Sequence, residues 1–146
     1  MISVDTQLFL YAFNEDAPEH RVAAETLAEL GRSDRVALCE LVLLEFYLLL
    51  RNPAVLARPL TSGDAARVCE TWRRHPRWRL VDAAPVMGEV WKRAAAPDFA
   101  RRRIIDARLA LTLRHHGVTT LYTRNVRDFD GFGFDRVVNP FSEQGG

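Results

Sequence analysis

Short β-branched runs alternate with helical patterns along the whole chain, and this alternation constrains the fold more than any other feature. Residues 2–4 and 36–39 are strand-like, and each run is followed by a segment with apolar residues at helical spacing. Strands that alternate with helices are typical of a parallel sheet, because parallel neighbours need a crossover connection. The sequence therefore predicts an α/β fold.

Proline, glycine and capping residues set the expected ends of these elements. Pro18 and Pro85 suit the first turn of a helix, and Gly31 and Gly117 suit the position after the last turn. The chain has 146 residues without an internal repeat or linker, so we expect one domain over residues 1–146. The expected strands are 2–4, 36–39, 78–81, 120–123 and 137–138, and the expected helices are 7–13, 18–30, 40–51, 62–74, 85–95 and 104–116.

The composition is that of an ordinary soluble protein, with 48% hydrophobic and 27% charged residues. No apolar run approaches the roughly 20 residues that a membrane helix needs, and no signal-peptide pattern precedes the first strand. Cys39 and Cys69 lack metal-type spacing and are interpreted as reduced, small hydrophobic residues. We therefore expect a cytoplasmic protein with no membrane partner. The net charge of +1 provides no global field that would draw it onto nucleic acid.

Four acidic residues interrupt apolar settings at strand ends or on helices: Asp5, Glu45, Asp106 and Asp128. All four can reach one edge of the sheet, where reactive groups collect beyond the carboxyl ends of parallel strands. Clustered carboxylates repel one another, and protonation or a cation must relieve that repulsion. Hard oxygen ligands select Mg²⁺ or Mn²⁺, and two such ions about 4 Å apart can activate water and stabilise the leaving oxygen of a phosphodiester.

Each acid also has a structural interpretation. Asp5 and Asp106 could cap helices, Glu45 could pair with an arginine, and Asp128 could form a turn. Each of these roles is plausible alone, but four acids at strand ends make the structural account the weaker one. Glu40, in the first turn of the helix that carries Glu45, is a rival for it, although that position favours contact with helix N–H groups.

Glu45 is the most informative of the four acids because of its neighbours. Its side chain is expected to enter or border the core unless it is drawn to the mouth of a cavity. Four leucines share its helical face: Leu41, Leu44, Leu48 and Leu49.

The segments that carry the acids resemble the PIN-domain nucleases. They are VDTQLFLYA at the start, the apolar helix with Glu45, IIDARLAL around Asp106 and LYTRNVRDF around Asp128. The stretch RNPAVLARPLTSGDAARVCETW resembles the VapC-type toxin branch of that family, and the resemblance covers residues 1 to 140. It implies a PIN-like, three-layer α/β/α sandwich with a mostly parallel five-stranded sheet in the order 3-2-1-4-5.

The same resemblance implies a Mg²⁺-dependent endoribonuclease, with Mn²⁺ as a substitute, that is the toxin of a toxin–antitoxin pair. Asp5, Glu45, Asp106 and Asp128 match the metal-binding acids of the family. Thr123 matches its hydroxyl residue, which positions metal-bound water or a carboxylate. The implied reaction is attack of a metal-bound water on the scissile phosphate, which leaves a 5′-phosphate and a 3′-hydroxyl. The implied partners are an RNA substrate, a cognate antitoxin and a second copy in a homodimer.

Two positions depart from the family pattern. Gln7 stands where many relatives carry Asn or Ser, and Asn125 stands where many carry Asp, so Asp128 would have to provide the fourth charge. The neutral Asn125 favours an alternative, a non-catalytic PIN module that binds RNA or protein. A phosphoaspartate phosphatase also begins with an Asp after its first strand, but it needs a second Asp where this chain has Gln7.

All basic residues except Lys92 are arginine, whose planar fork binds two phosphate oxygens at once. Arg102, Arg103 and Arg124 lie close to the acids or to Thr123 in the sequence. They are candidate phosphate contacts.

Overall fold

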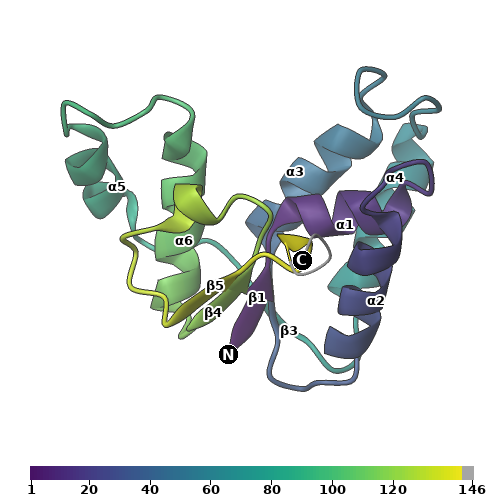
Figure 1. Cartoon of the computed structure of the whole chain (residues 1–146), viewed down its shortest axis with the longest axis horizontal. Helices are drawn as coiled ribbons and strands as arrows, with labels where there is room; N and C mark the ends of the chain where they lie inside the picture. Colours follow the sequence, from purple (N-terminus) through teal and green to yellow (C-terminus); the bar gives the residue numbers. More distant parts are fainter. Residues whose placement is uncertain (143–146) are drawn as a thin grey trace.

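A computed structural model describes residues 1–142, and its elements follow the predicted alternation of strands and helices (Figure 1). The observed ends differ from the expected ones by one or two residues; the helix expected at 85–95, for example, covers Met87–Ala94. The strands are β1 (Ile2–Val4), β2 (Ala37–Cys39), β3 (Arg79–Val81), β4 (Thr120–Tyr122) and β5 (Arg136–Val138). The helices are α1 (Thr6–Phe13), α2 (His20–Leu30), α3 (Glu40–Leu50), α4 (Ser62–Arg73), α5 (Met87–Ala94), α6 (Arg103–His115) and the 3-10 helix η1 (Val126–Phe129).

The strands form two parallel sets. β4 pairs with β1 on one side and β5 on the other, and β2 pairs with β3. A single bridge between Ile2 and Val36 joins the sets, and the Ile2 N–H donates to the Arg35 carbonyl at 2.8 Å. The Ser3 hydroxyl also donates to the Ala37 carbonyl at 2.6 Å. β1 and β2 are therefore neighbours, but no continuous ladder of hydrogen bonds joins them. The predicted strand order 3-2-1-4-5 requires β1 to pair with β2, and this step of the order stays a prediction.

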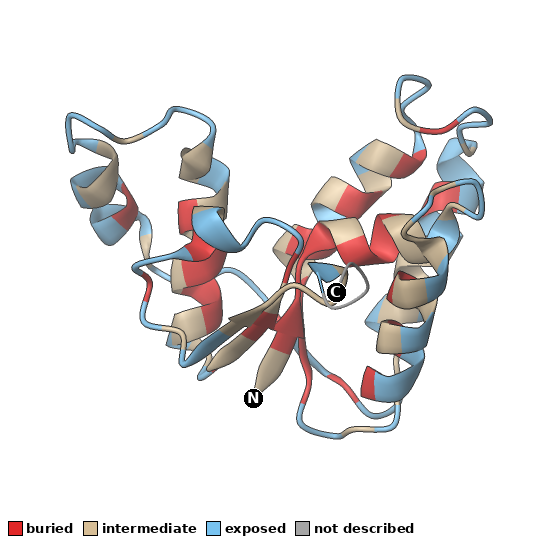
Figure 2. Cartoon of the chain, viewed as in Figure 1, coloured by how far each residue is buried: buried red, intermediate tan, exposed pale blue. Residues whose placement is uncertain are grey.

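Helices cover both faces of the strands. In Figure 1, α5 and α6 lie on one side of the strands and α1, α2, α3 and α4 lie on the other. Figure 2 shows that buried residues concentrate on the strands and on the inward faces of these helices. The predicted α/β sandwich is confirmed.

An aromatic cluster centred on Phe9 of α1 joins the helices on one side of the sheet. The Phe9 ring lies 5.8 Å from the Phe46 ring of α3 and 5.0 Å from that of Trp72 in α4, between centroids. Trp78 packs against Phe9 as well, and its Nε1–H donates to the Leu30 carbonyl at 2.9 Å, which satisfies its polar atom. This cluster holds α1 and α3 in a defined position at the end of β1.

The structure also describes the apolar helices and the two cysteines. Over residues 1–142, no helix has the length and apolar character to cross a bilayer. Cys39 is buried, Cys69 is half-buried and both are free thiols.

Candidate active site

Three of the four predicted acids line one cavity of about 240 Å³ beyond the carboxyl end of β1. Asp5 follows β1 and caps α1, Glu45 lies in the second turn of α3, and Asp106 lies in the first turn of α6. This acidic cavity is also lined by Thr6, Gln7, Leu48, Leu49 and Asn125.

Asp5 is held by a hydrogen bond on each carboxylate oxygen. Its Oδ1 accepts from the Thr6 backbone N–H at 2.7 Å, and its Oδ2 accepts from the Thr123 hydroxyl at 2.9 Å. Each carboxylate oxygen has two lone pairs, so one on each oxygen is left for a further ligand. Asp5 is only 6% exposed. It therefore caps a helix, as the structural interpretation expected, and also lines the cavity, while Thr123 orients it.

Thr6 connects Asp5 to Glu45. The Thr6 hydroxyl donates to Oε2 of Glu45 at 3.1 Å, and its backbone N–H donates to Asp5. Leu44 and Leu48, which share the helical face of Glu45, are 63% and 67% exposed. Leu41 and Leu49 share this face as well, but they are half-buried and pack against the core. The face therefore borders the core at the mouth of the cavity. Among residues 1–142, Glu45 forms no ion pair with an arginine.

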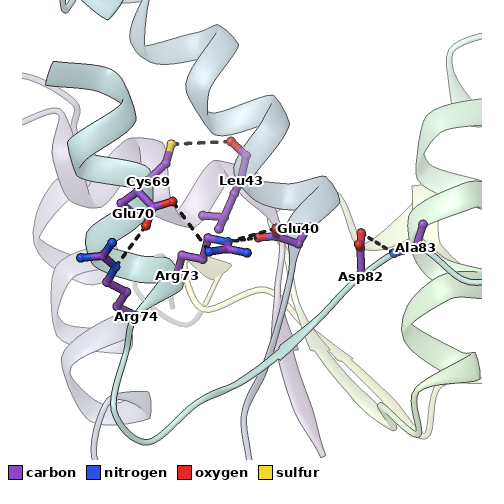
Figure 3. A network of polar contacts seen from close by, with 8 residues as sticks. All are labelled: Glu40, Leu43, Cys69, Glu70, Arg73, Arg74, Asp82 and Ala83. Atoms are coloured by element: carbon purple, nitrogen blue, oxygen red, sulfur yellow. Dashed lines mark hydrogen bonds and ion pairs between the residues drawn. The ribbon is translucent and has the colours of Figure 1, made fainter. Parts of the chain in front are cut away.

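Glu40, the rival of Glu45, is engaged elsewhere. Its two carboxylate oxygens accept from Nε of Arg73 at 3.0 and 3.1 Å. Figure 3 shows this pair at the start of α3, with Glu70 of α4 and Arg74, which directly follows α4, beside it. Glu40 lines a separate pocket together with Cys69. Its role in the structure is to tie α3 to α4.

Burial and mutual repulsion raise the pKa values of the acids in the cavity. Burial, together with the charges of Asp5, Asp128 and Glu45, raises the pKa of Asp106 from 3.8 to about 7, although Arg103 acts in the opposite direction. Burial also raises the pKa of Asp5, against its two hydrogen bonds, and that of Glu45, to which the Asp5 charge contributes. Without a cation, the cavity therefore holds protons that isolated carboxyls would release.

Asp128 lies beside the acidic cavity. It belongs to η1 and lines an adjoining groove of about 360 Å³, while Asn125 lines both the groove and the cavity. The Asp128 charge still contributes to the raised pKa of Asp5 and Asp106, so it acts on the cavity through space. Whether Asp128 or Asn125 completes a metal site stays a prediction.

Two of the three candidate phosphate contacts are engaged within the protein. Nη2 of Arg103 donates to the Asp128 carbonyl at 3.2 Å, which ties α6 to η1. Arg124 pairs with Glu19 at 2.6 Å. Arg102 is exposed and lines the groove, as does Arg127. Arg127 is not among the contacts predicted from the sequence, although its position next to Asp128 was an available signal.

The ligands offered by the cavity suit a hard cation. The described residues that line it contribute carboxylate, amide and hydroxyl oxygens and include no His or Cys. Within residues 1–142, no three His, Cys, Asp or Glu side chains form a group that could hold one ion together. Mg²⁺ usually keeps several waters and needs only one or two carboxylates. The residues therefore fit an open Mg²⁺ site and not a closed cage of protein ligands.

Comparison of the sequence with family models and known proteins identifies its family. The family model of the PIN domain matches residues 2–135. Ribonuclease VapC24 of Mycobacterium tuberculosis is 58% identical over 146 residues, which cover 99% of this chain and 100% of the relative.

Two solved structures share the fold. One is Mycobacterium tuberculosis VapC20, described as a Sarcin-Ricin loop cleaving toxin, with a TM-score of 0.64 and 20% identity over 83% of this chain and 87% of that one. The other belongs to a toxin-antitoxin complex from Klebsiella pneumoniae, with a TM-score of 0.60 and 17% identity over 96% and 98% of the two chains. These identities support the fold alone, whereas the family model and the full-length match to VapC24 show the relationship. The chain belongs to the PIN-domain family, as a VapC-type member.

Proposed function

We propose that the protein is a Mg²⁺-dependent endoribonuclease and the toxin of a toxin–antitoxin pair. The observation that carries the proposal is the acidic cavity, where Asp5, Glu45 and Asp106 come together from three separate segments. Burial, and after it the negative charge of the neighbouring acids, raises the pKa values of these three carboxyls, and a bound cation would favour their charged forms. The 58% identity to a ribonuclease supports RNA as the substrate class.

In this proposal Asp5, Glu45 and Asp106, with Asp128 or Asn125, share one or two ions. Each ion would take one or two of the carboxylates and keep several waters, since no three described acids are placed to hold one ion together. Bound Mg²⁺ would supply positive charge to the phosphate and lower the pKa of a coordinated water. Thr123 and Thr6 keep two of the carboxylates oriented through hydrogen bonds of 2.9 and 3.1 Å.

The reaction is hydrolysis of a phosphodiester. A water oxygen bonds to phosphorus and the bond from phosphorus to the 3′-oxygen breaks. The 3′-oxygen takes up a proton, which leaves a 5′-phosphate and a 3′-hydroxyl. As a toxin that acts on cellular RNA, the protein is proposed to work in the cytoplasm.

An antitoxin is the proposed protein partner. The similarity to a chain of a toxin-antitoxin complex supports it. Leu44 and Leu48 add a physical reason, because they expose an apolar strip on α3 and Leu48 also lines the acidic cavity. An antitoxin that covered this strip would also cover the cavity. A second copy of the chain, in a homodimer, is the other proposed occupant of exposed apolar surface.

One observation favours a second candidate, a non-catalytic module that binds RNA or protein. The neutral Asn125 lines the acidic cavity, whereas Asp128 lines the adjoining groove. A site with one carboxylate fewer binds a divalent cation less tightly.

Incubation of the purified protein with total RNA distinguishes the two candidates. We expect cleavage with Mg²⁺ or Mn²⁺, none in EDTA, and recovery when excess Mg²⁺ is restored. The new ends should carry a 5′-phosphate and should therefore be substrates for RNA ligation without prior phosphorylation. RNA binding without cleavage in either ion would support the non-catalytic module.

The fourth ligand can be tested by exchanging charge between positions 125 and 128. Because a hard cation prefers a full charge, Asn125→Asp should tighten Mn²⁺ binding and Asp128→Asn should weaken it, each by about 10- to 100-fold. Isothermal titration of the wild type, the two single variants and the double variant measures this. If Asp128→Asn binds like the wild type while Asn125→Ala loses the ion, three carboxylates and an amide form the site.

A further inference from the structure

A groove rich in arginine adjoins the acidic cavity and shares Asn125 with it. It has a volume of about 360 Å³ and is referred to below as the arginine groove. Three guanidinium groups and a single carboxylate line it, in a chain whose net charge is only +1. Its polar lining residues are Arg102, Arg124, Asn125, Arg127, Asp128 and Asn139.

Two of the arginines keep their charge available for a ligand. Within residues 1–142, neither Arg102 nor Arg127 forms an ion pair, and both are exposed. They come from different segments, since Arg102 directly precedes α6 and Arg127 belongs to η1. Arg103, adjacent to Arg102, differs from both because it donates to the Asp128 carbonyl and lies over the Phe99 ring at 5.8 Å.

The third arginine is held in place. Arg124 pairs with Glu19 at 2.6 Å, and its guanidinium carbon lies 5.6 Å from the Tyr11 ring centroid and 5.8 Å from that of Phe141. Its charge is thus largely compensated, while its plane is fixed by three neighbours. A fixed guanidinium plane is a surface on which an unpaired nucleobase can stack.

We propose that the arginine groove binds the nucleotide next to the cleaved phosphate of a single-stranded RNA. The phosphate of that nucleotide lies between Arg102 and Arg127, and its base stacks on Arg124. The inference rests on the proposed ribonuclease function. The acidic cavity repels a polyanion, so positive charge immediately beside it is needed to hold the strand there. Single-stranded RNA is the class that fits, because its unstacked bases can reach a guanidinium plane, whereas bases in a duplex cannot.

Binding of a short fluorescein-labelled single-stranded RNA, measured by anisotropy in EDTA, tests the groove without cleavage. We expect Arg102→Ala and Arg127→Ala each to weaken binding about tenfold and to reduce the slope of log K against log salt by about 0.7, the value for one phosphate contact on a single strand. Arg124→Lys keeps the charge but removes the plane, so it should weaken binding about tenfold with an unchanged slope. Arg35→Ala is the matched control, because Arg35 is exposed but precedes β2, at the opposite edge of the sheet. It should change neither quantity.

The results of these binding experiments distinguish a failure of the groove proposal from a failure of the ribonuclease proposal. The groove proposal is overturned if the wild type does not bind the RNA, if Arg102→Ala and Arg127→Ala keep the wild-type slope, or if Arg35→Ala has the same effect as they do. An unchanged affinity of Arg124→Lys overturns the stacking of the base. Equal binding of a duplex of the same sequence overturns the preference for single strands. If these variants behave as expected but the wild type cleaves no RNA in Mg²⁺, the groove stands and the ribonuclease proposal fails.

Discussion

Replacement of Asp5 or Asp106 by asparagine is expected to abolish RNA cleavage while the fold is retained. Loss of a group that only supports a metal ligand already costs about 10- to 100-fold, so the loss of a ligand itself should exceed about a hundredfold. Asn at position 5 can still accept the Thr6 N–H through its side-chain oxygen, and the cap on α1 is therefore kept. The measurement is the initial rate of RNA cleavage in saturating Mg²⁺.

The same variants should show that these charges oppose folding when no metal is present. Because the pKa of Asp106 rises from 3.8 to about 7 on folding, the folded protein binds more protons than the unfolded chain between these values. The stability of the metal-free protein should therefore fall as the pH rises through this window and stay low above it. Asp106→Asn removes this proton uptake, so its melting temperature should exceed that of the wild type above pH 7 and depend less on pH.

Thermal melting in EDTA across the same pH range measures both effects. A substantial drop in melting temperature for both Asp5→Asn and Asp106→Asn would identify these acids as structural partners and contradict their assignment to a metal site.

Substitutions at neighbouring positions of α3 are expected to have opposite effects, one lowering stability and another lowering activity. Phe46 is buried and packs on Phe9, so Phe46→Ala should cost about 3–5 kcal/mol of unfolding free energy. Glu45→Gln keeps the shape of the side chain and an acceptor for the Thr6 hydroxyl, so it should be nearly as stable as the wild type. Its cleavage rate should nevertheless fall by more than about tenfold, because the ion loses a charged ligand.

Leu48→Ala is the control for this helix. Leu48 is 67% exposed, and a surface truncation should change the unfolding free energy by no more than about 0.5 kcal/mol. Urea denaturation gives the free energies and the RNA assay gives the rates. Full Mg²⁺-dependent activity of Glu45→Gln would remove Glu45 from the site. Glu40 would be a poor replacement, since its carboxylate is paired with Arg73.

Local sequence determined the elements and the placement of the first acid. β-branched runs, prolines and glycines predicted segments whose ends lie within a residue or two of those observed, because these signals act over one or two turns of chain. The position of Asp5 directly after the first strand placed it at the carboxyl edge of a parallel sheet. The structure places it there, between Thr6 and Thr123.

Only the tertiary structure decided between neighbouring residues of the same type. α3 is apolar on nearly every side, so its pattern could not show that Phe46 faces the core and Leu48 faces solvent. Glu40 pairs with Arg73, a residue 33 positions away. Arg103 contacts the carbonyl of Asp128, whereas the adjacent Arg102 remains exposed. Burial and charge pairing depend on residues that meet only after the chain has folded, and local periodicity contains no information about those contacts.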